Sequence, residues 1–207
     1  MNESPEIPRN TARVVVLGDS LITAAGDSKG LGWLGRVISR TPNQNPRVDF
    51  YELAVPDETT AMLAERWATE VQRRFSTATD NYLVIALSNA DPAAGISLSR
   101  SRLNLATILD ECARAGIKTF VVGPTPHRNP ELNREVGQLS AGFEDVCNRR
   151  SVRYVDCFSP LVEHEGWNEE LSGSEHGIPG QLGYGLIAWL VLNRGWYQWL
   201  ELEAPAN

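Results

Sequence analysis

Short runs of β-branched residues alternate with longer stretches of helical periodicity along the chain, and this alternation constrains the fold more than any other feature of the sequence. The runs that predict strands are residues 13–18, 47–54, 81–88, 118–123 and 153–158. The stretches that predict helices include residues 59–75, 97–116 and 180–200. Strands separated by helices in this order pair in parallel, with helices on both faces of the sheet. The sequence therefore predicts an α/β fold, a three-layer α/β/α sandwich around a five-stranded parallel sheet.

In two of the predicted helices, the sequence also predicts which residues are buried. The buried stripe of the helix at residues 97–116 is predicted to hold Leu103, Ala106, Leu109 and Ala113. The last helix carries three tryptophans, Trp189, Trp196 and Trp199. Their spacing predicts packing in the core and at its rim, and disfavours a stacking platform for nucleic acid.

Length and composition limit the function classes. The 207 residues, of which 42% are hydrophobic, predict a single domain over residues 1–207 with loose ends at about residues 1–12 and 203–207. A formal net charge of −7 argues against nucleic acid or an anionic membrane as partner, so we expect a small-molecule substrate. The first residues contain no apolar segment typical of a signal peptide, and no apolar run approaches the length of a membrane span. A cytoplasmic location is therefore expected.

The three cysteines, Cys112, Cys147 and Cys157, are widely spaced and odd in number. This pattern is typical neither of a metal site nor of a disulfide framework, and it predicts buried thiols in a reducing compartment. We expect neither a metal nor another cofactor.

In a parallel sheet of this type, ligands bind outside the carboxyl ends of the strands, so the residues that follow each strand are the candidates for chemistry. The first predicted strand is followed by "GDSLITAAGDSKGLGW", residues 18–33. Further blocks are "VPDETTAMLAERW", "SLSRSRLNLATILDEC", "TFVVGPTP" and "PGQLGYGLIAWLVL". With these blocks in this order, the chain resembles the SGNH hydrolase family, also called GDSL esterases and lipases, and particularly its small intracellular actinobacterial members. The resemblance covers about residues 13–200 and implies the flavodoxin-like SGNH hydrolase fold.

The resemblance also implies a chemistry, serine acyl transfer. In the family a serine attacks an ester carbonyl, and a histidine three residues after an aspartate acts as base. The serine's own amide, a glycine amide and an asparagine side chain form the oxyanion hole. In this sequence the serine position is Ser20, preceded by Gly18 and Asp19.

Four other positions depart from the family pattern. The glycine position holds Asp57, whose carboxylate would repel a developing oxyanion, unless it serves only to cap the following helix. The block "SNAD", Ser88 to Asp91, puts Ala90 at the asparagine position. Asn89 lies one residue earlier, and on an extended chain its side chain is expected to face the opposite side, unless a bulge turns it back.

The last block places Glu175 at the aspartate position and Ile178 at the histidine position. His176 comes two residues too early, so a solvated loop histidine is favoured, although a rearranged loop can bring it to the pocket. His127 follows the fourth predicted strand and is a candidate substitute base or binding group. His164 is expected on the surface.

These departures leave three hypotheses. The favoured one is an enzyme that is not a standard ester hydrolase. Its pocket would hold an amine-bearing small molecule, and a carboxylate would deprotonate an amine or hydroxyl for displacement, cyclisation or acyl transfer, for example in a biosynthetic pathway. The acidic side chains expected around Ser20 are Asp19, Asp57, Asp91 and Glu175. The alternatives are a pseudoenzyme that binds a ligand or a partner protein, and a weak serine esterase in which His176 or His127 serves Ser20.

Overall fold

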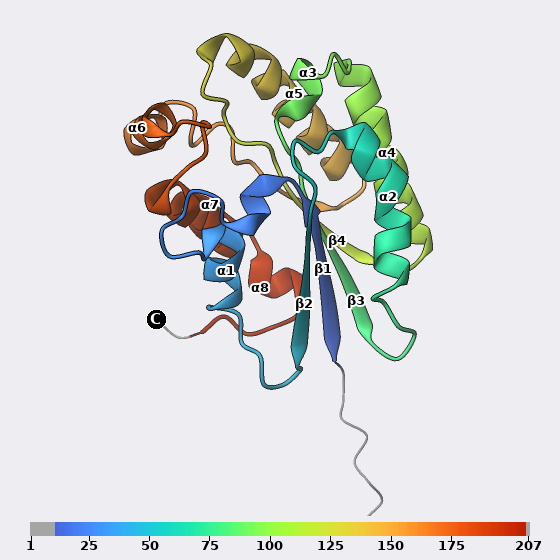
Figure 1. Cartoon of the computed structure of the whole chain (residues 1–207). Coiled ribbons are helices and arrows are strands. Elements are labelled where there is room, and N and C mark those ends of the chain that lie inside the picture. Colours follow the sequence, from blue (N-terminus) through green and yellow to red (C-terminus); the bar gives the residue numbers. More distant parts are fainter. Residues whose placement is uncertain (1–10, 206–207) are drawn as a thin grey trace, which may run out of the picture.

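The computed structural model describes residues 11–205, and over that range the chain forms a parallel sheet between two layers of helices (Figure 1). The strands are β1 (Ala12–Gly18), β2 (Val48–Ala54), β3 (Asp80–Ala86), β4 (Lys118–Val122) and β5 (Arg153–Val155). All of them pair in parallel, in the order β2-β1-β3-β4-β5. The helices are η1 (Ser20–Thr23), α1 (Gly32–Ile38), α2 (Thr60–Gln72), α3 (Ala90–Ala93), α4 (Leu98–Arg114), α5 (Pro130–Asn148), α6 (Glu165–Gly173), α7 (Gln181–Asn193) and α8 (Trp196–Trp199). The predicted fold class is confirmed.

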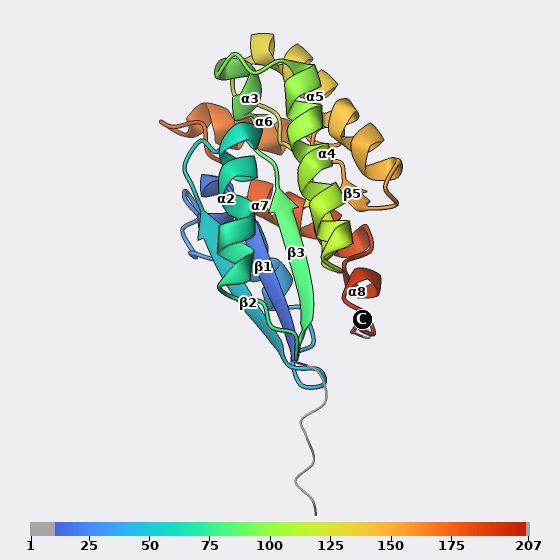
Figure 2. The same cartoon turned by 90° about the vertical axis from the view of Figure 1, so that its right-hand side faces the viewer.

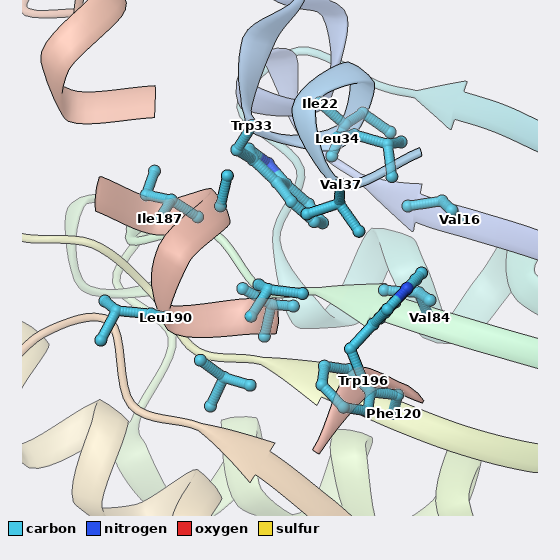
Figure 3. Packing of buried hydrophobic residues seen from close by; sticks show 14 of the residues in the cluster. Val16, Ile22, Trp33, Leu34, Val37, Val84, Phe120, Ile187, Leu190 and Trp196 are labelled. Atoms are coloured by element: carbon cyan, nitrogen blue, oxygen red, sulfur yellow. The ribbon is translucent and has the colours of Figure 1, made fainter. Parts of the chain in front are cut away.

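The central strands are apolar on both sides because helices cover both faces of the sheet. In β1, Val14 and Val16 point to one core cluster, whereas Val15 and Leu17 point to the other. Helices α1, α6, α7 and α8 lie on the first face, and α2, α4 and α5 lie on the second (Figures 1 and 2). Figure 3 shows the first cluster, in which Trp196 packs edge-on against a ring of β4.

The last predicted helix is interrupted. Helix α7 ends at Asn193, and α8 begins at Trp196 after Gly195, which has φ of 97°. Glycine suits this turn because residues with a Cβ rarely adopt a φ of 97°. The turn redirects the chain so that the Trp196 indole is buried and donates to Thr41 Oγ1 at 3.0 Å.

The predicted stripe of α4 is partly wrong. Leu103 is 54% exposed and Ala113 is exposed, whereas Leu109 is buried as expected. The helix instead faces the core with Leu105, Ile108 and Cys112. Apolar residues follow two overlapping periods in this segment, and only contact with the sheet selects one of them.

The two ends of the chain differ in part from the loose arms expected from the sequence. Ala12 belongs to β1 and is 3% exposed, so the expected loose arm is too long at this residue. The rest of that arm lies outside the described residues, apart from Thr11. Residues 203–205 have no regular secondary structure.

All three cysteines are buried and free, and burial raises the pKa of Cys112 and of Cys147 to about 12. Within residues 11–205, no helix is both long and apolar enough to cross a bilayer.

Candidate active site

A pocket of about 240 Å³ lies at the carboxyl ends of β1, β2, β3 and β4. Its apolar lining residues include Leu21, Pro126, Trp167, Leu171 and Pro179. Seven residues proposed from the sequence line it together: Asp19, Ser20, Asp57, Asn89, His127, His176 and Ile178. Four others, Gly18, Ser88, Asp91 and Glu175, do not line it. The fold therefore collects most of the candidate residues where a sheet of this type binds ligands.

Ser20 begins the single turn η1, directly after β1. The Asp19 carboxylate caps this turn by accepting a hydrogen bond of 2.9 Å from the Leu21 N–H. The Thr23 hydroxyl donates to the Ser20 carbonyl at 2.7 Å, which fixes the turn further. In the described part of the chain, no group forms a hydrogen bond with Ser20 Oγ. Ser20 is therefore positioned at the pocket without a hydrogen-bonded base in the described residues.

Asp19 has the most perturbed carboxyl group of the pocket. Burial raises the pKa of Asp19 to about 6, the negative charges of Asp57 and Glu58 act in the same direction, and the hydrogen bond from Leu21 opposes them. A carboxyl group with this pKa exchanges its proton near neutral pH, as a general acid or base must.

Asp19→Asn is expected to raise the free energy of unfolding at pH 8. The folded protein holds the Asp19 proton more tightly than the unfolded chain does, because the pKa is about 6 against an ordinary 3.8. Protonation of Asp19 therefore favours the fold below about pH 4, and this contribution is lost as the pH rises from about 4 to about 6. At 1.36 kcal/mol per pKa unit, the loss is at most about 3 kcal/mol.

Urea unfolding of wild type and Asp19→Asn between pH 4 and pH 8 measures this difference. Glu169→Gln, which removes an exposed carboxylate on α6, is the matched control and should follow wild type. The same pH slope in wild type and in Asp19→Asn would contradict the effect.

Asp57 occupies the left-handed region of backbone space, with φ of 52°. This conformation favours glycine, the residue of the family pattern at this position, and it costs an aspartate about 1 kcal/mol. The capping alternative does not hold, because Thr59 caps α2 by accepting from the Met62 N–H at 3.3 Å. The Asp57 side chain is exposed and lines the pocket.

Two backbone amides of pocket-lining residues are free to act as oxyanion donors. In the described residues, the N–H groups of Ser20 and Asp57 donate to no protein acceptor. The third position of the family pattern is Ala90, the first residue of α3, which has no polar side chain. The pocket thus keeps two free backbone amides and holds the Asp57 carboxylate beside them.

Asn89 differs from the expectation that it faces away from the site. Its side-chain amide donates to the Thr125 carbonyl at 3.1 Å, and both residues line the pocket. No bulge is involved. The chain has left β3 at Ala86 and is already turning into α3 at Asn89, so the alternation of side chains along a strand no longer applies.

The residues that do not line the pocket have structural partners. Asp91 is 1% exposed and accepts hydrogen bonds from the backbone N–H and the hydroxyl of Thr60, at 2.8 and 2.6 Å. The Ser88 hydroxyl donates to the Glu58 carbonyl. Gly18 lets β1 approach β3 closely, because a Cβ there would stand 2.8 Å from the Ala86 carbonyl oxygen. These contacts join the strand ends around the pocket.

The loop before α7 carries the remaining candidates. Ile178 lines the pocket and lies against Gly26, where an added Cβ would be 3.6 Å from the Ile178 Cβ. Glu175 is exposed outside the pocket, and its backbone carbonyl accepts from Arg128 Nη1 at 3.0 Å. His176 is exposed at the rim and forms no hydrogen bond with Ser20 in the described part of the chain. The expectation of a solvated loop histidine agrees with this exposure.

His127 is oriented by its own loop. Its Nδ1 accepts a hydrogen bond of 2.8 Å from the Asn129 N–H, so the neutral ring carries its proton on Nε2. In this tautomer, His127 can donate a hydrogen bond through Nε2 but has no free nitrogen to act as a base. His164 lies outside the site and caps α6, where its Nδ1 accepts from the Trp167 N–H at 3.3 Å.

Glu170 of α6 is a positioning residue that sequence reasoning missed. Its carboxylate accepts three backbone N–H groups at the start of α7, those of Gly180, Leu182 and Gly183, at 2.8 to 3.0 Å. It thereby caps α7 from a neighbouring helix and fixes the loop that carries Ile178. Because Glu170 lies ten or more residues before the amides that it caps, no local sequence pattern indicates this cap.

Among residues 11–205, no cluster of three or more His, Cys, Asp or Glu side chains is arranged to hold a metal ion.

Comparison with known proteins supports a relationship at the level of family and fold. The sequence model of the GDSL-like lipase/acylhydrolase family matches residues 16–186. No curated protein matches the chain in sequence. A lipase/acylhydrolase from Enterococcus faecalis is similar in structure, with a TM-score of 0.72 at 20% identity over 94% of this chain and 99% of that chain. The acetylxylan esterase Axe2 from Geobacillus stearothermophilus gives 0.69 at 14% identity, over 93% and 97% of the two chains. The esterase EstA from Pseudoalteromonas sp., in a form inhibited by monoethylphosphonate, gives 0.67 at 15% identity, over 91% and 98%.

Proposed function

Because the chain belongs to the GDSL-like lipase/acylhydrolase family, we propose that it uses the pocket of this family for carboxylate-assisted chemistry on an amine-bearing small molecule, and not for ordinary ester hydrolysis. One observation carries the proposal. Ser20 Oγ has no hydrogen-bonded base in the described residues, while two carboxylates, those of Asp19 and Asp57, line the same pocket. A weak or absent nucleophile beside two carboxylates favours proton transfer over acyl-enzyme formation.

The acidic and the nitrogen-bearing side chains of the pocket come from different elements. Asp19 and Asp57 come from the ends of β1 and β2, whereas His127, Arg128 and His176 come from the loops after β4 and α6. Since Asp91 and Glu175 do not line the pocket, it is less acidic than the sequence suggested. The acidic side chains suit an ammonium group, and the nitrogen-bearing side chains suit an anionic or electron-withdrawing part of the same molecule.

This arrangement of side chains suits a nucleophilic displacement that begins with a proton transfer to a carboxylate. A carboxylate of Asp19 or Asp57 accepts a proton from the amine or hydroxyl of the ligand. The lone pair of that nitrogen or oxygen then forms a bond to an electrophilic carbon, and the leaving group departs with the electron pair of the broken bond. The pKa of about 6 suits Asp19 for the proton transfer, and the exposed Asp57 carboxylate suits electrostatic contact with the ammonium.

Substitution of Asp57 tests the proposal. Saturation-transfer NMR with a set of small primary amines and their matched alcohols is expected to detect amines preferentially. Asp57→Asn, which keeps the shape and removes the charge, should weaken amine binding by at least about tenfold while leaving the thermal midpoint near that of wild type. Unchanged amine binding in Asp57→Asn would contradict an electrostatic role, and a lower thermal midpoint alone would indicate a structural one.

A second candidate function is slow acyl transfer from Ser20. The amides of Ser20 and Asp57 are free to bind an oxyanion, and His176 lines the same pocket. This function requires His176 to move to Ser20 Oγ. Ester cleavage that is abolished by both Ser20→Ala and His176→Ala would favour this candidate over the first.

A further inference from the structure

Two hollows larger than the active-site pocket lie on the surface formed by α1, α7 and α8. Their volumes are about 470 and 910 Å³. The two hollows adjoin each other and share three lining residues, Arg40, Trp189 and Leu192. Helices α1 and α7 pack against each other beneath them (Figure 1). We call this surface, centred on Trp189 between the two hollows, the Trp189 groove.

Trp189 has no role in the core. Trp196 and Trp199 are buried as their spacing predicted, but the Trp189 side chain is 60% exposed, and Leu31 at the edge of the groove is 42% exposed. An exposed indole leaves a large apolar area in water, which burial against a partner would remove at a gain of about 25 cal/mol per Å². Tryptophan is also the residue type most enriched among the energetic centres of protein interfaces.

The charges around Trp189 are of one sign. The residues that line the two hollows include five cations, Lys29, Arg36, Arg40, Arg153 and Arg194, and no Asp or Glu. Arg36 pairs with Asp27. In the described part of the chain, the other four have no carboxylate within ion-pair distance. A chain with a net charge of −7 thus gathers, among its described residues, four cations without an ion-pair partner on one face.

We propose that the Trp189 groove binds an acidic, amphipathic segment of a partner protein. Apolar side chains of that segment pack on Trp189 and Leu192, and its carboxylates pair with Arg40 and Arg194 at the rim. Arginine suits such pairing because its planar guanidinium binds a carboxylate through two parallel hydrogen bonds.

The shape and charge of the groove favour this occupant over two others. A two-fold dimer through the groove would place the same cations against one another, which is unfavourable. An anionic membrane presents a broad surface that would also meet the many carboxylates of this acidic chain, whereas a single segment contacts the groove alone. The inference is independent of the chemistry proposed for the Ser20 pocket, because none of the residues that line the groove lines that pocket.

The test uses a fluorescein-labelled peptide of about four helical turns, with leucines along one face and glutamates elsewhere. Fluorescence anisotropy measures its binding to the full chain, and a scrambled peptide of the same composition is the reference. We expect binding of the amphipathic peptide to weaken by at least about tenfold in Trp189→Ala, and likewise in the pair Arg40→Glu with Arg194→Glu. The scrambled peptide should bind more weakly to wild type.

Two controls match these variants away from the groove. Leu103→Ala removes an exposed apolar side chain of α4, and Arg73→Glu with Arg100→Glu makes the same change of net charge at exposed sites. Both should stay within about twofold of wild type. The proposal is overturned if wild type binds neither peptide, if the controls weaken binding as much as the groove variants, or if binding is seen only with phosphatidylglycerol vesicles. Sedimentation that shows a dimer lost in Trp189→Ala would overturn it in favour of a second copy of this chain.

Discussion

Wild-type protein is expected to hydrolyse p-nitrophenyl acetate no faster than Ser20→Ala does, within about twofold, and at least about a hundredfold more slowly than an active esterase of the family. The reason is structural. Ser20 Oγ has no hydrogen-bonded base in the described residues, and the resemblance to the family implies that Ile178 stands at its histidine position and Ala90 at its asparagine position. Loss of one oxyanion donor alone costs about a hundredfold or more in rate.

The assay follows p-nitrophenolate release at pH 8 by both proteins at equal concentration, against the buffer blank. Release by wild type at the rate of an active relative, with Ser20→Ala reduced to the blank, would establish an ordinary serine esterase. That outcome would also require a rearranged loop, since His176 forms no hydrogen bond with Ser20 in the structure.

Rebuilding the family site is expected to show strong non-additivity. Ile178→His with Glu175→Asp should raise esterase activity by less than about tenfold, because Glu175 is exposed outside the pocket and the oxyanion hole is unchanged. Adding Asp57→Gly and Ala90→Asn should raise it by at least a further factor of about one hundred, since groups that act as a unit do not contribute independently. Glycine fits residue 57 without backbone change, as φ is already 52° there.

The set of variants needs three members: the first pair alone, the second pair alone and all four together. The second pair alone should stay near wild type, because an oxyanion hole without a base does not activate Ser20. Full activity from the first pair alone would contradict the role assigned to Asp57 and Ala90.

Much of the fold could be predicted from the sequence, because both faces of the sheet are buried and the strands are therefore continuous apolar runs. The prediction for β4 was wrong by only one residue at its end, and that for β5 extended three residues too far. Cys157 explains the second error, since it is buried like a strand residue although the chain has already left the sheet. The break at Gly195 was missed because a single glycine in an apolar helix signals either a packing contact or an end.

The site was harder to predict because its geometry depends on loops. The sequence indicated that Ser20 and Asp57 would meet at one edge of the sheet, and strand order alone ensures this. It could not show that Asn89 turns back toward the pocket or that Glu175 points away from it, because both depend on how short loops leave regular elements. The tautomer of His127 follows from the single hydrogen bond from the Asn129 N–H, which no spacing encodes.

Phosphonylation of Ser20 tests most directly whether Ser20 is an activated nucleophile in this pocket. A fluorophosphonate reacts only with a serine that is activated by a base and whose developing oxyanion is held. Intact-mass spectrometry after incubation at pH 8, under conditions that fully label an active esterase of the family, is predicted to show less than about one tenth of the chain modified. The variant carrying Ile178→His, Glu175→Asp, Asp57→Gly and Ala90→Asn should be labelled, and its labelling should be lost on Ser20→Ala. Stoichiometric labelling of wild type at Ser20 would contradict the account and identify the protein as a working serine hydrolase.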